Sequence, residues 1–274
     1  MIPNPVDFSG RVAVVTGGSG VLGGAIARAL GEAGATVWIV GRSRPEAAEA
    51  AAKAIRDAGG KAEAAQADVL DRAALEALAA RLLARHGRLD FLVNAAGGAR
   101  KEATTAPDRS FFDLPEEAVR QVFDLNWLGT FLPCQVFGKI MADRQSGAIL
   151  NLSSYGALHP LTRSVAYSAG KAAVTNFTQW LAVHLAQTYS PRLRVNALVP
   201  GFFLTEQNRF LLTEEATGQL TERGRRIVSH TPAGRFGEPS DLTGPALWLL
   251  SDAAGFVNGA TLSVDGGLSA FGGI

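Results

Sequence analysis

The chain has 274 residues, of which 47% are hydrophobic and 19% charged, so it can bury a large core and is too apolar for a disordered protein. The formal net charge is only +1 at pH 7, which argues against nucleic acid or an anionic membrane as a partner. A single cysteine, Cys134, excludes an internal disulfide and a cysteine-rich zinc site, and we expect no metal. The N-terminus has no signal-peptide pattern, and no run of ~20 apolar residues could span a membrane, so we expect a cytoplasmic protein.

The start of the chain predicts a strand, a glycine-rich turn and a helix. The β-branched run at 11–16 is typical of a buried strand, and the alanine-rich segment after Gly23 is typical of a helix that stops at Gly34. Glycines let the backbone approach a pyrophosphate, and a helix N-terminus offers free N–H groups. We therefore predict a dinucleotide phosphate site formed by Gly17, Ser19, Gly20, Val21, Leu22 and Gly23.

The second predicted strand, at 36–40, is followed by Arg42 and Arg44. An acidic residue at this place binds the 2′-hydroxyl of an adenosine ribose, whereas an arginine accommodates a 2′-phosphate. No Asp or Glu occurs at 41–44, so the sequence favours NADP(H), with NAD(H) still possible. Two solvated arginines at the start of a helix would give the same pattern.

Helices at 45–58 and 71–86 alternate with strands at 61–66 and 89–93. An aspartate after the third strand can meet the adenine, and small residues and an amide after the fourth suit close approach of a cofactor. The candidates are Asp68, Val69, Asn94, Ala95, Ala96 and Gly97. A polar loop at 98–113 leads to a long helix from Pro115, in which Asn126 lies among apolar residues and needs hydrogen-bond partners.

A fifth strand at 148–152 brings Ser154 to its carboxyl end, and the next helix contains Tyr167 and Lys171. Residues four apart share one face of a helix. An ammonium beside a phenol lowers the phenol's pKa from its usual ~10, which makes a general acid/base for neutral pH. A surface tyrosine beside a solvated lysine has the same spacing, so the other motifs must show whether this pair is catalytic.

A sixth strand at 193–198 ends at Pro200 and Gly201, a polar segment at 202–231 suggests a helical flap, and a helix at 239–250 precedes a last strand at 261–264. Alternating strands and helices predict one α/β domain over residues 1–274. Its fold would be a doubly wound (Rossmann) parallel sheet of seven strands with helices on both faces. Such sheets bind ligands outside the carboxyl ends of their strands, where all of these motifs fall.

These motifs together resemble the short-chain dehydrogenase/reductase family over nearly the whole chain. One departure is at Val21, where the family has a glycine that stands here one residue earlier. The resemblance implies an NAD(P)-dependent enzyme in which Tyr167 exchanges a proton with the substrate oxygen, Ser154 hydrogen-bonds that oxygen, and Lys171 holds the nicotinamide ribose. It further implies that Asn126 positions a water and that Thr205 contacts the carboxamide. Tyr167 and Lys171 would thus contact the cofactor as well. Family members are mostly tetramers, so we expect a homotetramer packed through the helices around 115–138 and 165–186.

Segments such as NAAGG and PGFFLTEQNRFLL resemble the D-mannonate oxidoreductase (fructuronate reductase) branch of this family. This resemblance implies a sugar acid as substrate, for which Arg163, Asn208 and Arg209 are candidate contacts. A gluconate/ketogluconate, polyol or 3-oxoacyl reductase is the alternative within the same class. A dinucleotide-sensing protein without catalysis is a further alternative, but it would not need all four catalytic candidates.

Overall fold

A computed structural model describes residues 6–42, 44–205, 209, 212–214 and 217–272. Its strands form one parallel sheet in the order β3-β2-β1-β4-β5-β6-β7, so the chain winds outward in both directions from β1 and β4. This confirms the predicted doubly wound α/β fold. The strands are β1 (Val12–Thr16), β2 (Thr36–Gly41), β3 (Lys61–Gln66), β4 (Phe91–Asn94), β5 (Gly147–Leu152), β6 (Leu193–Pro200) and β7 (Thr261–Val264).

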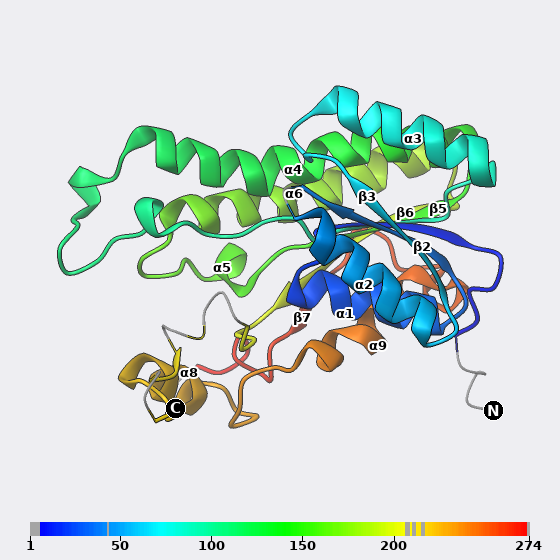
Figure 1. Cartoon of the computed structure of the whole chain (residues 1–274). Coiled ribbons are helices and arrows are strands. Elements are labelled where there is room, and N and C mark those ends of the chain that lie inside the picture. The colour runs from blue at the N-terminus through cyan, green and yellow to red at the C-terminus, as the bar shows by residue number, and fades with distance from the viewer. Residues whose placement is uncertain (1–5, 43, 206–208, 210–211, 215–216, 273–274) are drawn as a thin grey trace.

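Helices cover both faces of the sheet (Figure 1). One face packs against α3 (Arg72–His86), α4 (Glu116–Asp143) and α6 (Val165–Thr188), and the other against α1 (Val21–Glu32), α2 (Pro45–Asp57) and α9 (Thr243–Leu250). β1 shows why a continuous apolar run suits this position: Val12 and Val14 enter one core, while Ala13 and Val15 enter the other.

Element boundaries differ from the sequence expectation at several functional places. Helix α1 begins at Val21 rather than after Gly23, and Gly20 is its N-cap. The predicted glycine-rich turn therefore includes the first turn of the helix. The loop after β4 contains two 3₁₀ turns, η1 (Lys101–Ala103) and η2 (Phe111–Asp113). A short helix, α5 (Tyr155–Leu158), follows β5 and was not predicted. The expected helix at 239–250 divides into a 3₁₀ turn, η3 (Pro239–Leu242), and α9.

The segment between β6 and β7 is long and contains α8 (Glu222–His230). Figure 1 shows α8 standing apart from the sheet, on the side of α5 and away from α2. The helical content expected for the flap is therefore present in its described part.

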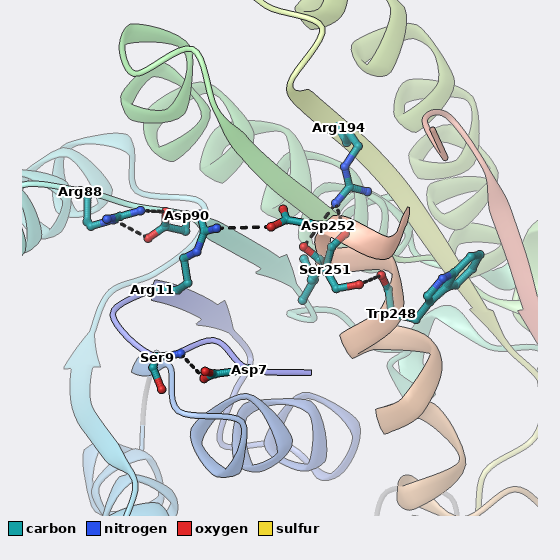
Figure 2. Close-up of polar contacts among 10 residues, drawn as sticks. Asp7, Ser9, Arg11, Arg88, Asp90, Arg194, Trp248, Ser251 and Asp252 are labelled. Carbon is teal, nitrogen blue, oxygen red and sulfur yellow. Dashed lines mark hydrogen bonds and ion pairs between the residues drawn. The ribbon is translucent and has the colours of Figure 1, made fainter. Parts of the chain in front are cut away.

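At the amino-terminal ends of the strands, a polar network joins segments that are distant in the sequence (Figure 2). Asp90 accepts hydrogen bonds from Arg88 Nε (2.8 Å), from the Val12 amide (2.9 Å) and from Arg11 (3.3 Å). Burial alone raises the pKa of Asp90, but these hydrogen bonds outweigh burial and hold it below its ordinary value. This network fixes the edge of the sheet opposite the predicted site.

Arg194, on β6, completes the same region (Figure 2). Its guanidinium donates to the carbonyl oxygens of Leu249 (2.7 Å) and Ser251 (3.0 Å), at the carboxyl end of α9. A cation there satisfies carbonyl groups that the helix cannot pair internally. The arginine thus ties the end of α9 to β6, the strand next to the edge strand β7. Within the described residues, no helix is both long and apolar enough to cross a membrane.

Candidate active site

A cavity of about 480 Å³ opens at the carboxyl ends of the strands. It extends from the segments after β2 and β3 to those after β5 and β6, so it follows this edge of the sheet from β3 to β6. Most of the predicted site residues line it: Gly17, residues 19–23, Arg42, Val69, residues 95–97, Ser154, Tyr167, Lys171, Pro200, Gly201 and Thr205. Motifs spread over nearly two hundred residues therefore meet in one cavity.

The glycine-rich turn is packed too tightly for larger residues. Gly17 has φ = +63°, and a Cβ there would lie 2.7 Å from the backbone nitrogen of Ala96. A Cβ on Gly23 would lie 2.5 Å from the carbonyl oxygen of Gly17. No side chain caps the N-terminus of α1, so the N–H groups of its first turn remain for an anion. These residues fit the pyrophosphate of a dinucleotide, and Val21 in place of the family's glycine stands in the first turn of α1 without closing the cavity.

Arg42 and Asp68 lie together after β2 and β3. Arg42 Nη1 is 3.7 Å from Asp68 Oδ2, and both side chains are partly exposed. Asp68 also accepts a hydrogen bond from the Leu70 amide and does not line the cavity, whereas Val69 does. The structure therefore brings the expected arginine to the cavity, but turns the expected adenine contact, Asp68, toward the arginine.

Asn94 does not reach the cavity through its side chain. The side chain is buried, and its Nδ2 donates to Cys134 Sγ (3.2 Å) and Asn151 Oδ1 (2.9 Å). Residues alternate sides along a strand, and Asn94, the last residue of β4, faces the helical layer of α4 and α6. Its amide holds the strand end in place, while the next three residues form the cavity wall.

Tyr167, Ser154 and Lys171 converge where β5 ends. Ser154 is the N-cap of α5, with its Oγ accepting from the Gly156 amide at 3.1 Å, and it is hydrogen-bonded to the Tyr167 side chain. Lys171 is buried, its Nζ donates to the Leu152 carbonyl at 2.7 Å, and it lies 5.9 Å from the centre of the Tyr167 ring. The predicted phenol, hydroxyl and ammonium thus share one wall of the cavity.

The titration of these groups differs from the sequence expectation. Burial raises the pKa of Tyr167 above its ordinary value, and the hydrogen bond with Ser154 only partly opposes this. Burial also lowers the pKa of Lys171 to about 8. The expected lowering of the tyrosine's pKa by the lysine is not found, because burial disfavours both charged forms and Lys171 directs its ammonium to Leu152. Tyr167 is a neutral phenol at neutral pH, which suits a proton donor.

Asn126 is fully buried on α4 and tethers the loop after β4. Its Nδ2 donates to the carbonyl oxygens of Gly98 and Val122, both at 2.8 Å, and its Oδ1 accepts from the Gly98 amide at 3.2 Å. A Cβ on Gly97 would lie 2.7 Å from Asn126 Oδ1 and 3.1 Å from Lys171 Nζ. Asn126 is therefore close to Lys171 without lining the cavity, and its side chain binds backbone atoms, in a way the sequence did not indicate.

The predicted substrate contacts are less well placed. Arg163 is exposed and does not line the cavity, and neither does Arg209, while Asn208 lies outside the described residues. Among the lining residues that were not predicted are two large polar side chains, Tyr155 on α5 and Arg223 on α8. The segment 222–230 contains three arginines, and nothing in its spacing shows which one faces the cavity, because that depends on how α8 is placed. Among the described residues, no cluster of His, Cys, Asp or Glu could hold a metal ion.

A family model described as Enoyl-(Acyl carrier protein) reductase matches residues 19–269. The chain belongs to the short-chain dehydrogenase/reductase family, and it is an NAD(P)-dependent oxidoreductase that acts on alcohol groups.

Particular relatives extend over the full length. The uncharacterized oxidoreductase UxuB of Bacillus subtilis is 46% identical over 283 residues, with 100% of both chains covered. A solved structure of a proposed D-mannonate oxidoreductase from Haemophilus influenzae, with bound NAD, is 39% identical and has a TM-score of 0.91 over 98% of both chains. A proposed gluconate 5-dehydrogenase from Beutenbergia cavernae, with bound NADP, is 35% identical and has a TM-score of 0.84 over 97% of this chain and 100% of the other.

Proposed function

We propose that this oxidoreductase interconverts a secondary alcohol and a ketone on a sugar acid, with D-mannonate and D-fructuronate as the pair. The observation that carries the choice of substrate is the likeness, over 98% of both chains, to the Haemophilus influenzae protein described as a proposed D-mannonate oxidoreductase. The chemistry follows from the wall of the cavity that holds Tyr167, Ser154 and Lys171.

In the direction of reduction, the neutral phenol of Tyr167 would donate its proton to the carbonyl oxygen of the substrate. Ser154 would donate a hydrogen bond to the same oxygen and stabilise its developing negative charge. The phenolate that remains needs a positive charge, which Lys171 can provide from its place beside the ring. A bound nicotinamide dinucleotide supplies the hydride in this direction and accepts it in the other. Asn126 would keep the loop next to Lys171 in position and could hold a water of the proton relay.

NADP(H) is the proposed cofactor, with NAD(H) as the alternative. Arg42 and Arg44 line the cavity at the end where an adenosine ribose would lie, and a guanidinium suits a 2′-phosphate. The relatives carry NAD in one structure and NADP in another, so they do not favour either cofactor. Asp68 beside Arg42 reduces the net positive charge there, and Arg44 adds a second guanidinium to the same end of the cavity.

A homotetramer packed through α4 and α6 is the proposed assembly. Trp180 and Val183 on α6 expose 57% and 56% of their surface, and Trp180 stacks on His184, so this helix presents an apolar face. Light scattering on the purified protein tests the assembly. We also propose that the enzyme acts in the cytoplasm, in keeping with its single buried thiol. Fractionation of cells that produce the protein tests this location.

A substrate panel tests the proposed function. Purified protein is offered D-fructuronate, 5-ketogluconate, a 3-oxoacyl thioester and neutral ketoses, each with NADPH and with NADH. We expect D-fructuronate with NADPH to give the highest kcat/KM. A preference for 5-ketogluconate would support the second candidate, a gluconate dehydrogenase, which the likeness to the Beutenbergia cavernae protein favours. Binding of NADPH without turnover of any carbonyl compound would instead indicate a dinucleotide sensor.

A further inference from the structure

Arg223 lies at the reacting end of the cavity rather than at the cofactor's ribose end. The order of the sheet puts β2 and β3 on one side of β1, and β5 and β6 on the other side of β4. Both arginines line the same cavity, but Arg42 follows β2, whereas Arg223 belongs to the segment after β6 and feels the charge of Arg163, which lies between α5 and α6. In Figure 1, α8 correspondingly lies on the side of α5 and away from α2.

Packing around Leu212 fixes the first turn of α8, which contains Arg223. Thr221 is the N-cap, and its backbone nitrogen donates to the Leu212 carbonyl at 3.0 Å. Gly224 comes so close that a Cβ there would lie 2.3 Å from the same oxygen. Leu212 itself lines the cavity. Two residues, Glu222 and Arg223, lie between these anchored positions, and of the two only Arg223 lines the cavity. The backbone that carries Arg223 is therefore fixed by packing on both sides.

The guanidinium of Arg223 is half-buried and meets another positive charge instead of a negative one. Its pKa is lowered, first by burial and then by the charge of Arg163. Two other arginines near the cavity or in the same segment each have a carboxylate partner: Arg42 has Asp68, and Arg235 has Asp241. Among the described residues, no carboxylate lies within 4.0 Å of Arg223 or Arg163. Two guanidiniums near enough to repel each other, one of them partly desolvated, are stabilised when an anion binds to them.

We propose that Arg223 binds the carboxylate of the substrate and that Arg163 strengthens this contact through its charge. The inference rests on the proposed function and deepens it, since it assigns the residue that separates sugar acids from neutral sugars. A planar guanidinium pairs with a carboxylate through two parallel N–H donors, so it fixes orientation as well as affinity. Arg163, predicted from the sequence as a direct contact, becomes an electrostatic neighbour.

Arg223→Gln tests the anchor, with Arg226→Gln as the matched control. Arg226 lies on the same helix, carries the same charge and is exposed, and it does not line the cavity. For Arg223→Gln we expect KM for the sugar acid to rise about 10- to 100-fold, as for loss of a charge-assisted hydrogen bond, with a smaller change in kcat. KM for a neutral ketose and Kd for NADPH should not change, and Arg223→Lys should recover part of the affinity. A raised Kd for NADPH, or equal effects of the two Gln variants, would overturn the assignment.

A binding experiment keeps the inference separate from the proposed reaction. The complex of the protein with NADPH is titrated calorimetrically with D-gluconate and with sorbitol, which differ only in a carboxylate against a CH₂OH group. We expect the wild type and Arg226→Gln to prefer gluconate, and Arg223→Gln to lose that preference. If the wild type does not prefer gluconate, the anchor is wrong. If it prefers gluconate through Arg223 but reduces no sugar acid, the proposed substrate is wrong and the anchor stands.

Discussion

At the scale of single residues, burial decides how the catalytic groups titrate. Tyr167 and Lys171 are both enclosed, so the neutral forms of both are favoured relative to water. A neutral phenol is ready to donate a proton, and the ammonium of Lys171 becomes most useful after that donation has left a negative charge. Lys171 therefore stabilises the phenolate that forms during the reaction more than it stabilises the neutral phenol before it.

Tyr167→Phe removes the proton donor without changing the shape of the ring. We expect turnover to fall by about 10²- to 10⁴-fold, the usual contribution of general acid/base catalysis, with NADPH affinity nearly intact. Tyr189→Phe, on an exposed tyrosine, is the control. Steady-state kinetics and fluorescence titration with NADPH make the measurement, and full activity of the Tyr167 variant would mean that another group donates the proton.

Arg42→Ala should weaken NADPH more than NADH, because only NADPH carries the 2′-phosphate. The expected difference is about 10-fold or more, the size of a lost charge-assisted contact. Lys53→Ala, which removes an exposed cation on α2 that is paired with Asp57, should affect neither cofactor. Equal losses for both cofactors would remove the basis for preferring NADP(H).

At the scale of elements, the site depends on how loops are tied to helices. The backbone after β4 carries the wall of small residues at 95–97, and Asn126 on α4 holds the next residue, Gly98, through both its N–H and its C=O. Glycine is needed at 97 because a side chain there would collide with Asn126 and approach Lys171. One buried amide thus connects α4 to the loop beside Lys171.

Asn126→Ala should destabilise the protein and loosen this loop together. Loss of the hydrogen bonds to Gly98 and Val122 should lower the free energy of unfolding by about 2–3 kcal/mol, since each net bond contributes ~1 kcal/mol and Gly98 is left unpaired. Thr130→Val is the comparison, because Thr130 Oγ1 bonds only a carbonyl of its own helix. Urea unfolding and kcat measure both effects. A stability loss no larger than that of Thr130→Val would show that the tether is unimportant.

At the scale of the whole molecule, the two ends of the strands are specialised. The carboxyl ends carry the cavity, whereas the amino-terminal ends carry the ion pairs of Asp90 with Arg11 and Arg88 and the cap of α9 by Arg194 (Figure 2). Stability and reactivity are therefore supported by different edges of one sheet. Substitutions at the amino-terminal ends of the strands should therefore change the free energy of unfolding more than they change kcat.

Asp90→Asn tests this separation. At pH 7 it should lower the free energy of unfolding by about 1–3 kcal/mol, as for hydrogen bonds to a charged group, and leave kcat nearly unchanged. The folded pKa of Asp90 lies below its unfolded value of 3.8, so its stabilisation is present above pH ~4 and is lost as pH falls through the folded pKa. The difference between wild type and variant should therefore shrink below pH ~4. Unfolding measured from pH 3 to 7 checks this, and a constant difference would mean that the charge of Asp90 is not responsible.

Much of the architecture was predictable because its signals are local. A strand, turn and helix around Gly17–Gly23 follow from neighbouring residues alone, and so does the shared face of Tyr167 and Lys171. The N-cap of α3 is another local feature, in which the carboxylate of Asp71 accepts a hydrogen bond from the Ala74 amide at 3.1 Å. Parallel strands then bring their carboxyl ends together, so a common site followed without any contact being known.

The remaining features depended on contacts between distant segments. Residues far away in the chain set the directions of the Asn94 and Asp68 side chains. They also decide which of the three arginines on α8 reaches the cavity, and whether Lys171 or burial controls the pKa of Tyr167. The sequence by itself determined the order of the elements and the types of groups at the strand ends. Only the tertiary structure decided their orientation and desolvation, because both arise from packing that no local pattern encodes.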